Sequence, residues 1–134
     1  FQSTTNLRMD WLDNNNSAYS NINYSRYDDN DDALTNSTNQ DNIALYVGTN
    51  TTNYFFEIEL SSKTPSATNG QTNWMIAKGH ATGSSGIDTK CELYASFASN
   101  NSTNRIYGFK IRPAGTNNYF QIGTKILVYK YNES

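Results

Sequence analysis

The chain has 134 residues, a mass of 15.1 kDa and a formal net charge of −2, and 16% of its residues are charged. A length near the common domain size predicts a single domain over residues 1–134, and the low charge excludes the basic surface that nucleic-acid backbones require. No apolar run approaches the roughly 18–20 residues that span a bilayer, so we expect no membrane insertion.

The composition is rich in aromatic residues and in uncharged polar residues. Aromatic residues make up 13% of the chain, and 20 Asn, 15 Thr and 14 Ser supply polarity in place of charge. The aromatic rings offer enough area to close a core. Cys91 is the single cysteine and cannot form an internal disulfide, so stability has to come from packing and strand pairing. Because the chain begins at Phe1 rather than Met, we expect a processed chain or part of a longer protein.

Apolar residues recur at every second position along the chain, which predicts strands and no long helix. Eight strands are predicted, over residues 7–11, 18–27, 43–47, 54–60, 74–78, 90–97, 107–111 and 125–131. The fourth alternates apolar residues with Glu57 and Glu59, as a half-buried strand does. The last is apolar on both faces, which predicts a strand covered on both sides.

Polar segments rich in Asn, Asp, Gly and Pro separate these strands, among them 28–32, 65–70 and 113–118. Two sheets packed face to face would bury the apolar sides of so many short strands. We therefore predict an all-β fold, an antiparallel two-sheet β-sandwich, jelly-roll-like, with about eight strands. The side chains expected in its core are Phe56, Ile58, Leu93, Phe97, Phe109, Ile111, Ile126 and Val128.

The sequence offers no basis for catalysis. His80 is the single histidine and has no nucleophile motif around it, so we interpret it as a surface or edge-strand residue. Glu57 and Glu59 lie on one strand face without a second carboxyl partner, which indicates a solvent face rather than a glycosidase pair. Cys91 falls on the predicted core face, which argues against a zinc site. We predict that the protein is not an enzyme.

An acidic run could supply hard oxygen ligands to calcium through Asp28, Asp29, Asp31 and Asp32. The run lacks the spacing and the glycine of an EF-hand. A solvated loop that blunts an edge strand is the simpler interpretation. We expect no cofactor, with calcium at these four residues as the weaker alternative.

Seven Asn-x-Ser/Thr sequons occur, at Asn15, Asn23, Asn36, Asn50, Asn100, Asn101 and Asn132. This composition produces about four by chance, so the excess is slight and does not by itself indicate a glycosylated protein.

Several aromatic residues fall outside the alternation that defines the core. Rings of this kind, flanked by Asn, Asp or Thr, stack on the apolar faces of sugars in β-sandwich lectins and also make adaptable protein interfaces. Ordinary packing or a subunit contact is the competing interpretation of each. The candidate ligand-binding residues are Tyr19, Tyr27, Trp74, Tyr94 and Tyr119.

The segment 104–132 resembles a pattern found in bacteriophage virion proteins, in which a strand of the form Ile-x-Gly-Ile/Phe-x-Ile precedes Phe-x-x-Gly-Ser/Thr-x-Ile-x-Leu/Val-Tyr. Matching residues are Ile106, Ile111, Phe120, Gly123, Thr124, Ile126, Val128 and Tyr129. Lys130 stands where the pattern usually has Gly. The stretch 7–27 looks like the opening of such domains.

The resemblance implies a non-enzymatic domain of a tail fibre, baseplate or head fibre, located on the virion surface or extracellular. Its partners would be other virion subunits and a glycan or protein of the host surface. The resemblance implies a homo-oligomer, with a trimer favoured by analogy. The alternatives are a carbohydrate-binding module of a secreted enzyme and a purely structural capsid or tail decoration domain.

Overall fold

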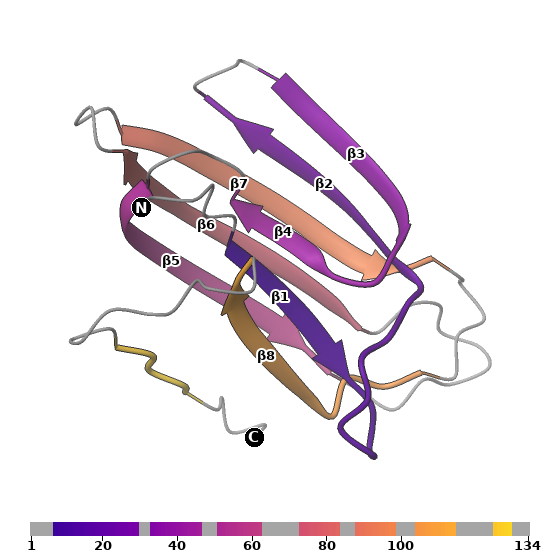
Figure 1. Ribbon diagram of the computed structural model, residues 1–134. Coiled ribbons are helices and arrows are strands. Elements are labelled where there is room, and N and C mark those ends of the chain that lie inside the picture. Colours follow the sequence, from indigo (N-terminus) through magenta and orange to yellow (C-terminus); the bar gives the residue numbers. More distant parts are fainter. Residues whose placement is uncertain are drawn as a thin grey trace, which may run out of the picture.

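The computed structural model describes residues 7–29, 33–46, 51–62, 73–83, 88–98, 104–114 and 125–129. These residues form two antiparallel sheets and no helix (Figure 1). Within them no helix is long and apolar enough to cross a membrane. The strands are β1 (Leu7–Leu12), β2 (Ile22–Asp28), β3 (Ala33–Gln40), β4 (Ile43–Tyr46), β5 (Thr51–Ser61), β6 (Trp74–Gly83), β7 (Asp88–Phe97) and β8 (Gly108–Pro113).

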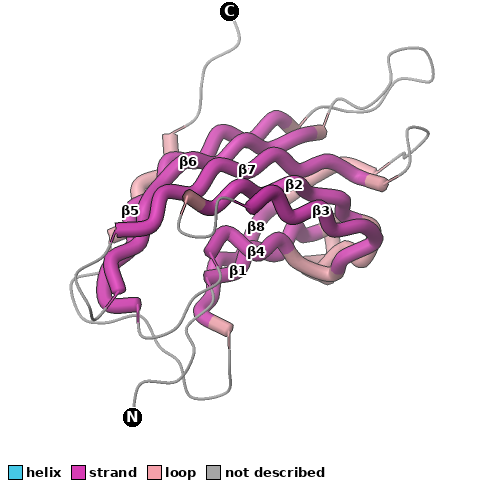
Figure 2. Tube along the Cα trace, turned by 90° about the horizontal axis from the view of Figure 1, so that it is seen from above, coloured by secondary structure: helices cyan, strands magenta, loops and turns pink. Residues whose placement is uncertain are grey.

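A three-stranded sheet, in the order β4-β1-β8, packs against a five-stranded sheet, in the order β3-β2-β7-β6-β5 (Figure 2). This arrangement confirms the predicted all-β, two-sheet sandwich. The pairs β1–β8 and β2–β7 join early to late strands in the nested manner of a jelly roll, whereas β5, β6 and β7 follow one another as a meander.

The core lies between the two sheets, where alternate side chains of each strand meet. Trp11 is fully buried and its ring meets that of Phe97 edge to face, with centroids 5.2 Å apart. In β7 the side chains from Cys91 to Phe97 alternate between buried and exposed or half-buried, and in β5 the apolar residues from Tyr54 to Leu60 alternate with exposed ones. The phase predicted for these two strands is therefore confirmed.

Burial of the expected core residues is uneven. Leu93 and Phe97 are buried. The other four within strands, Phe56, Ile58, Phe109 and Ile111, are partly buried and pack against the core. All four lie on β5 or β8, the outermost strands on one side of their sheets. The prediction that these side chains point inward is confirmed, but the prediction that they are fully buried is wrong.

The predicted last strand is wrong. Residues 125–129 form no strand, and Ile126 and Val128, which were expected in the core, are 54% and 69% exposed. The segment is apolar on both faces of the predicted strand, which led us to expect a strand covered on both sides. In the structure it pairs with no described strand. An apolar composition alone does not specify which strand a segment pairs with.

β3 is a strand that the sequence did not predict, and it brings the number of described strands to eight. Its side chains from Leu34 to Gln40 are exposed apart from half-buried Ser37, and it lies at one edge of the five-stranded sheet. Without a buried face, it carries no apolar alternation. Asn39 adopts a left-handed conformation (φ 52°) near a register shift between β2 and β3.

Several boundaries also differ, because β5 starts at Thr51 rather than Tyr54 and β6 runs to Gly83 rather than Lys78. The second strand begins at Ile22 rather than near Ala18, which makes only an isolated bridge to Leu12. Asp28, expected in a solvated loop, is the last residue of β2 and is buried.

Candidate functional site

Three of the five candidate aromatic residues lie on the same surface, the face of the five-stranded sheet that points away from the core. Tyr27 on β2 and Tyr94 on β7 are 37% and 50% exposed. Trp74, at the start of β6, is half-buried and shares the outward phase of Ile76. The sequence had placed these residues off the core pattern, and the register of the strands brings them together.

Strand register joins these residues into a continuous stripe. Tyr94 lies directly opposite Ile76 of β6, and Tyr27 lies opposite Leu34 of β3. Tyr27 and Tyr94 are diagonal neighbours on adjacent strands, because Tyr27 faces Glu92. Diagonal neighbours are typically about 7–8 Å apart, within reach of aromatic rings. We call Leu34, Tyr27, Tyr94, Ile76 and Trp74 the aromatic stripe.

Such a stripe is unusual on the solvent side of a sheet. An antiparallel sheet with one buried face normally presents polar residues on the other, and grouped exposed apolar side chains mark binding surfaces more often than scattered ones do. Leu34 and Ile76 belong to the stripe but were not predicted. Only the strand register could have identified them, because it places Leu34 opposite Tyr27 and Ile76 opposite Tyr94. Leu34 is also in a strand without apolar alternation.

Amides and hydroxyls border the stripe. Ser25, opposite Tyr94, donates its hydroxyl to Asn36 Oδ1 at 2.6 Å. The Oδ1 atom of Asn23 accepts the backbone N–H of Asn39 at 2.9 Å. Both contacts use the carbonyl oxygen of the amide, so each amide group keeps its nitrogen as a donor. Two of the sequons, at Asn23 and Asn36, therefore lie beside the stripe.

Charged side chains lie along one side of the stripe and not within it. Lys78 Nζ and Glu92 Oε1 are 4.0 Å apart, and both side chains are about two-thirds exposed. Glu57 lies opposite Lys78 in the next strand. Exposed pairs of this kind contribute little to stability, and the stripe itself is uncharged.

Tyr19 is apart from this surface. Its ring meets Phe97 edge to face at 5.0 Å, and its hydroxyl donates to the carbonyl of Arg105 at 2.9 Å. Burial, with a smaller contribution from the charge of Asp13, raises the pKa of Tyr19. Tyr19 thus joins the loop before β2 to the segment before β8. Tyr119 lies outside the described residues.

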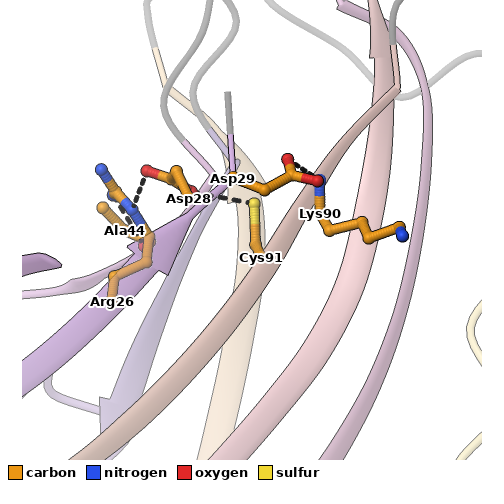
Figure 3. A network of polar contacts seen from close by, with 6 residues as sticks. All are labelled: Arg26, Asp28, Asp29, Ala44, Lys90 and Cys91. Carbon is orange, nitrogen blue, oxygen red and sulfur yellow. Dashed lines mark hydrogen bonds and ion pairs between the residues drawn. The ribbon is translucent and has the colours of Figure 1, made fainter. Parts of the chain in front are cut away.

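A buried polar network lies on the opposite, inward face of β2 (Figure 3). Arg26 Nε is 2.8 Å from Asp28 Oδ2, and Arg26 Nη1 donates to the carbonyl of Ala44 in the other sheet at 3.1 Å. The Cys91 thiol donates to Asp28 Oδ1 at 3.0 Å. Burial, and then the hydrogen bond to Asp28, raises the pKa of Cys91 far above its ordinary value. This thiol is protonated and inert at neutral pH.

Two of the calcium candidates already have protein partners. Both oxygens of Asp28 are bonded within the network, and Asp29 Oδ1 accepts the backbone N–H of Lys90 at 2.6 Å. Asp31 and Asp32 lie outside the described residues. Among the residues that the structure describes, no group of three or more His, Cys, Asp or Glu side chains is placed to hold a metal ion.

His80, Glu57 and Glu59 are exposed, as expected from their phase. His80 is on β6, which is an interior strand of its sheet, and its ring stacks on Phe55 at 5.7 Å. The strand pairing places Glu57 opposite Lys78 and Glu59 opposite Ile76. Glu57 and Glu59 therefore place carboxylates on the β5 side of the stripe rather than extending it.

Comparisons with family models, with curated proteins and with solved structures gave no match to this chain. The aromatic stripe is therefore interpreted from its own chemistry.

Proposed function

We propose that the chain is a non-enzymatic binding domain that holds a glycan on the outer face of its five-stranded sheet. The observation that carries this proposal is the alignment of Tyr27, Tyr94 and Trp74 on one face by the register of three strands. Aromatic rings stack on the apolar faces of sugars, and neighbouring amides bond the hydroxyls. Asn23, Ser25 and Asn36 supply these polar groups at the border.

The ligand that fits best is an uncharged glycan, because no charged side chain lies within the stripe. Strand pairing holds the ring-bearing backbone in place, so little ordering is needed on binding. Each contact is weak, and several copies on one particle would raise the avidity through effective concentration.

We further propose that this binding attaches a bacteriophage particle to its host surface. The support for that setting is the likeness of the C-terminal motif and of the stretch 7–27 to phage virion domains. A carbohydrate-binding module of a secreted enzyme would use the same stripe, and the two differ in setting, an enzyme in place of a virion.

A purely structural domain is the second candidate. The exposed apolar segment 125–129 favours it, because such a segment is suited to subunit contact. A structural domain predicts contacts with neighbouring subunits and no glycan ligand.

The test is a glycan array probed with the whole chain, made in a host without N-glycosylation so that Asn23 and Asn36 stay unmodified, and displayed on a multivalent carrier. Binding of an uncharged glycan is expected. Tyr94→Ala should weaken it at least about tenfold, which corresponds to 1.4 kcal/mol. Tyr107→Ala is the matched control, because Tyr107 is 59% exposed but lies outside the five-stranded sheet.

Absence of any bound glycan, or equal losses in the two variants, would contradict the proposal. Both variants should keep the unfolding midpoint of the parent chain, since both side chains are at least half exposed.

A further inference from the structure

Residues 125–129 form an apolar segment without a place in either sheet. Its residues Ile126, Leu127, Val128 and Tyr129 are 54–79% exposed. In Figure 1 the segment is the yellow trace that lies apart from the arrows. β-branched and aromatic residues favour strands, so the segment has the composition of a strand but no partner among the described strands.

The three-stranded sheet has an edge that could accept such a strand. Within the described residues β8 pairs with β1 alone, so its other side presents backbone groups that are not used within a sheet. The Ser62 hydroxyl, just after β5, donates to the carbonyl of Ile106, just before β8. The free edge of β8 therefore lies on the β5 side of the sandwich.

The core is incompletely covered on this same side. The inward residues of β5, from Tyr54 to Leu60, are only partly buried, whereas inward residues of β6 and β7 such as Met75 and Ala95 are fully buried. Phe109 and Ile111 on β8 are also partly buried. One more strand beside β8 would cover these side chains, because the opposing sheet has five strands and this one has three.

We propose that residues 125–129 of one copy add as a strand to the free edge of β8 in a second copy of this chain. Successive strand residues point to opposite faces, so either Ile126 and Val128 or Leu127 and Tyr129 would turn toward β5. The segment stands away from the β8 edge of its own copy, which leaves the edge of another copy as its site. Reciprocal exchange of this kind builds a closed oligomer.

Light scattering of the 134-residue chain at micromolar concentration tests the assembly. The expected mass is two or more times 15.1 kDa. The double variant Leu127→Lys with Val128→Lys, which puts a charge on both faces of the segment, should be a monomer. Leu34→Lys is the matched control, because Leu34 is about as exposed as Leu127 but lies on the aromatic stripe, and it should leave the mass unchanged.

Cross-linking identifies which copy supplies the strand. Lys110 on β8 and Lys125 are both exposed, so an amine-reactive linker applied to a refolded equal mixture of light and heavy isotope forms should join them. Links that combine both isotopes are expected. Links confined to one isotope, a monomeric parent chain, or the same mass change in Leu34→Lys as in the double variant would overturn the proposal.

Discussion

The two faces of the five-stranded sheet come from the same strands but differ in what their side chains do. On β7, Leu93 and Phe97 point inward and are nearly inaccessible, while Tyr94 between them is half exposed. The inward residues hold the sheets together, and the outward ones form a surface that the fold does not need. Replacements on the inner face should therefore lower stability, and those on the stripe should lower binding alone.

The largest effect is expected from Phe97→Ala. Phe97 is 2% exposed and its ring contacts both Trp11 and Tyr19. Its truncation should cost about 3–5 kcal/mol, the range for a large core aromatic. Urea unfolding measures the loss. Tyr94→Ala, on the outer face of the same strand, should change stability by less than about 1 kcal/mol. Similar losses in the two variants would mean that the faces are not separated as described.

Asp28→Ala should follow, at about 3 kcal/mol or more, because it leaves the Arg26 guanidinium buried without its carboxylate. Asp41→Ala is the control, since Asp41 is exposed and its removal changes the net charge equally. The double variant Arg26→Met with Asp28→Leu should lose less than Asp28→Ala, because no unpaired charge stays buried. A double variant as unstable as the single one would show that packing, not charge, dominates at this position.

The two faces were predictable from sequence to different degrees. Alternation gave the phase of β5 and β7, because each turns one row of apolar side chains toward the core. The polar network was not predictable, because Asp28 and Cys91 come together only through the register of β2 and β7. Asp28 was assigned to a loop since acidic runs are usually solvated, and its burial depends on the guanidinium two residues earlier.

The candidate site shows the same limit. Tyr27, Tyr94 and Trp74 could be selected because they break the core pattern, but nothing in the sequence showed that they share a surface. Leu34 was missed with the whole of β3, whose pairing depends on backbone hydrogen bonds to β2 rather than on apolar burial. The segment 125–129 shows the converse, since a strongly apolar sequence without a paired edge did not make a strand.

Gly79→Ala should have the next largest effect, about 1–3 kcal/mol, the usual cost of overpacking. A Cβ atom at Gly79 would clash with the carbonyl oxygen of Phe55 and lie 2.6 Å from the Phe56 ring, which covers this position. Thermal unfolding measures the loss. Gly108→Ala is the matched control, because its Cβ would meet nothing nearer than Leu12 at 3.8 Å. A tolerated Gly79→Ala would show that the inner face near β5 is more loosely packed than described.

The smallest effect concerns the pH dependence of stability through Cys91. Burial and the hydrogen bond to Asp28 raise the pKa of this thiol in the folded chain far above the ordinary value of 9.0. Below pH 9 the thiol is protonated in both states, so its contribution to stability is fully present. Above pH 9 only the unfolded chain loses the proton, so the free energy of unfolding should fall by up to about 1.4 kcal/mol per pH unit from this group.

The measurement has to separate this thiol from other groups, because Tyr19 has a raised pKa as well. It is therefore the difference between the parent chain and Cys91→Ala in urea unfolding at pH 8 and pH 10. The parent should lose about 1 kcal/mol more than the variant over this interval. Parallel losses in the two proteins would mean that the Cys91 thiol ionises in the folded chain as readily as in the unfolded chain. The inner face of β7 would then be open to solvent at this position, as its outer face is.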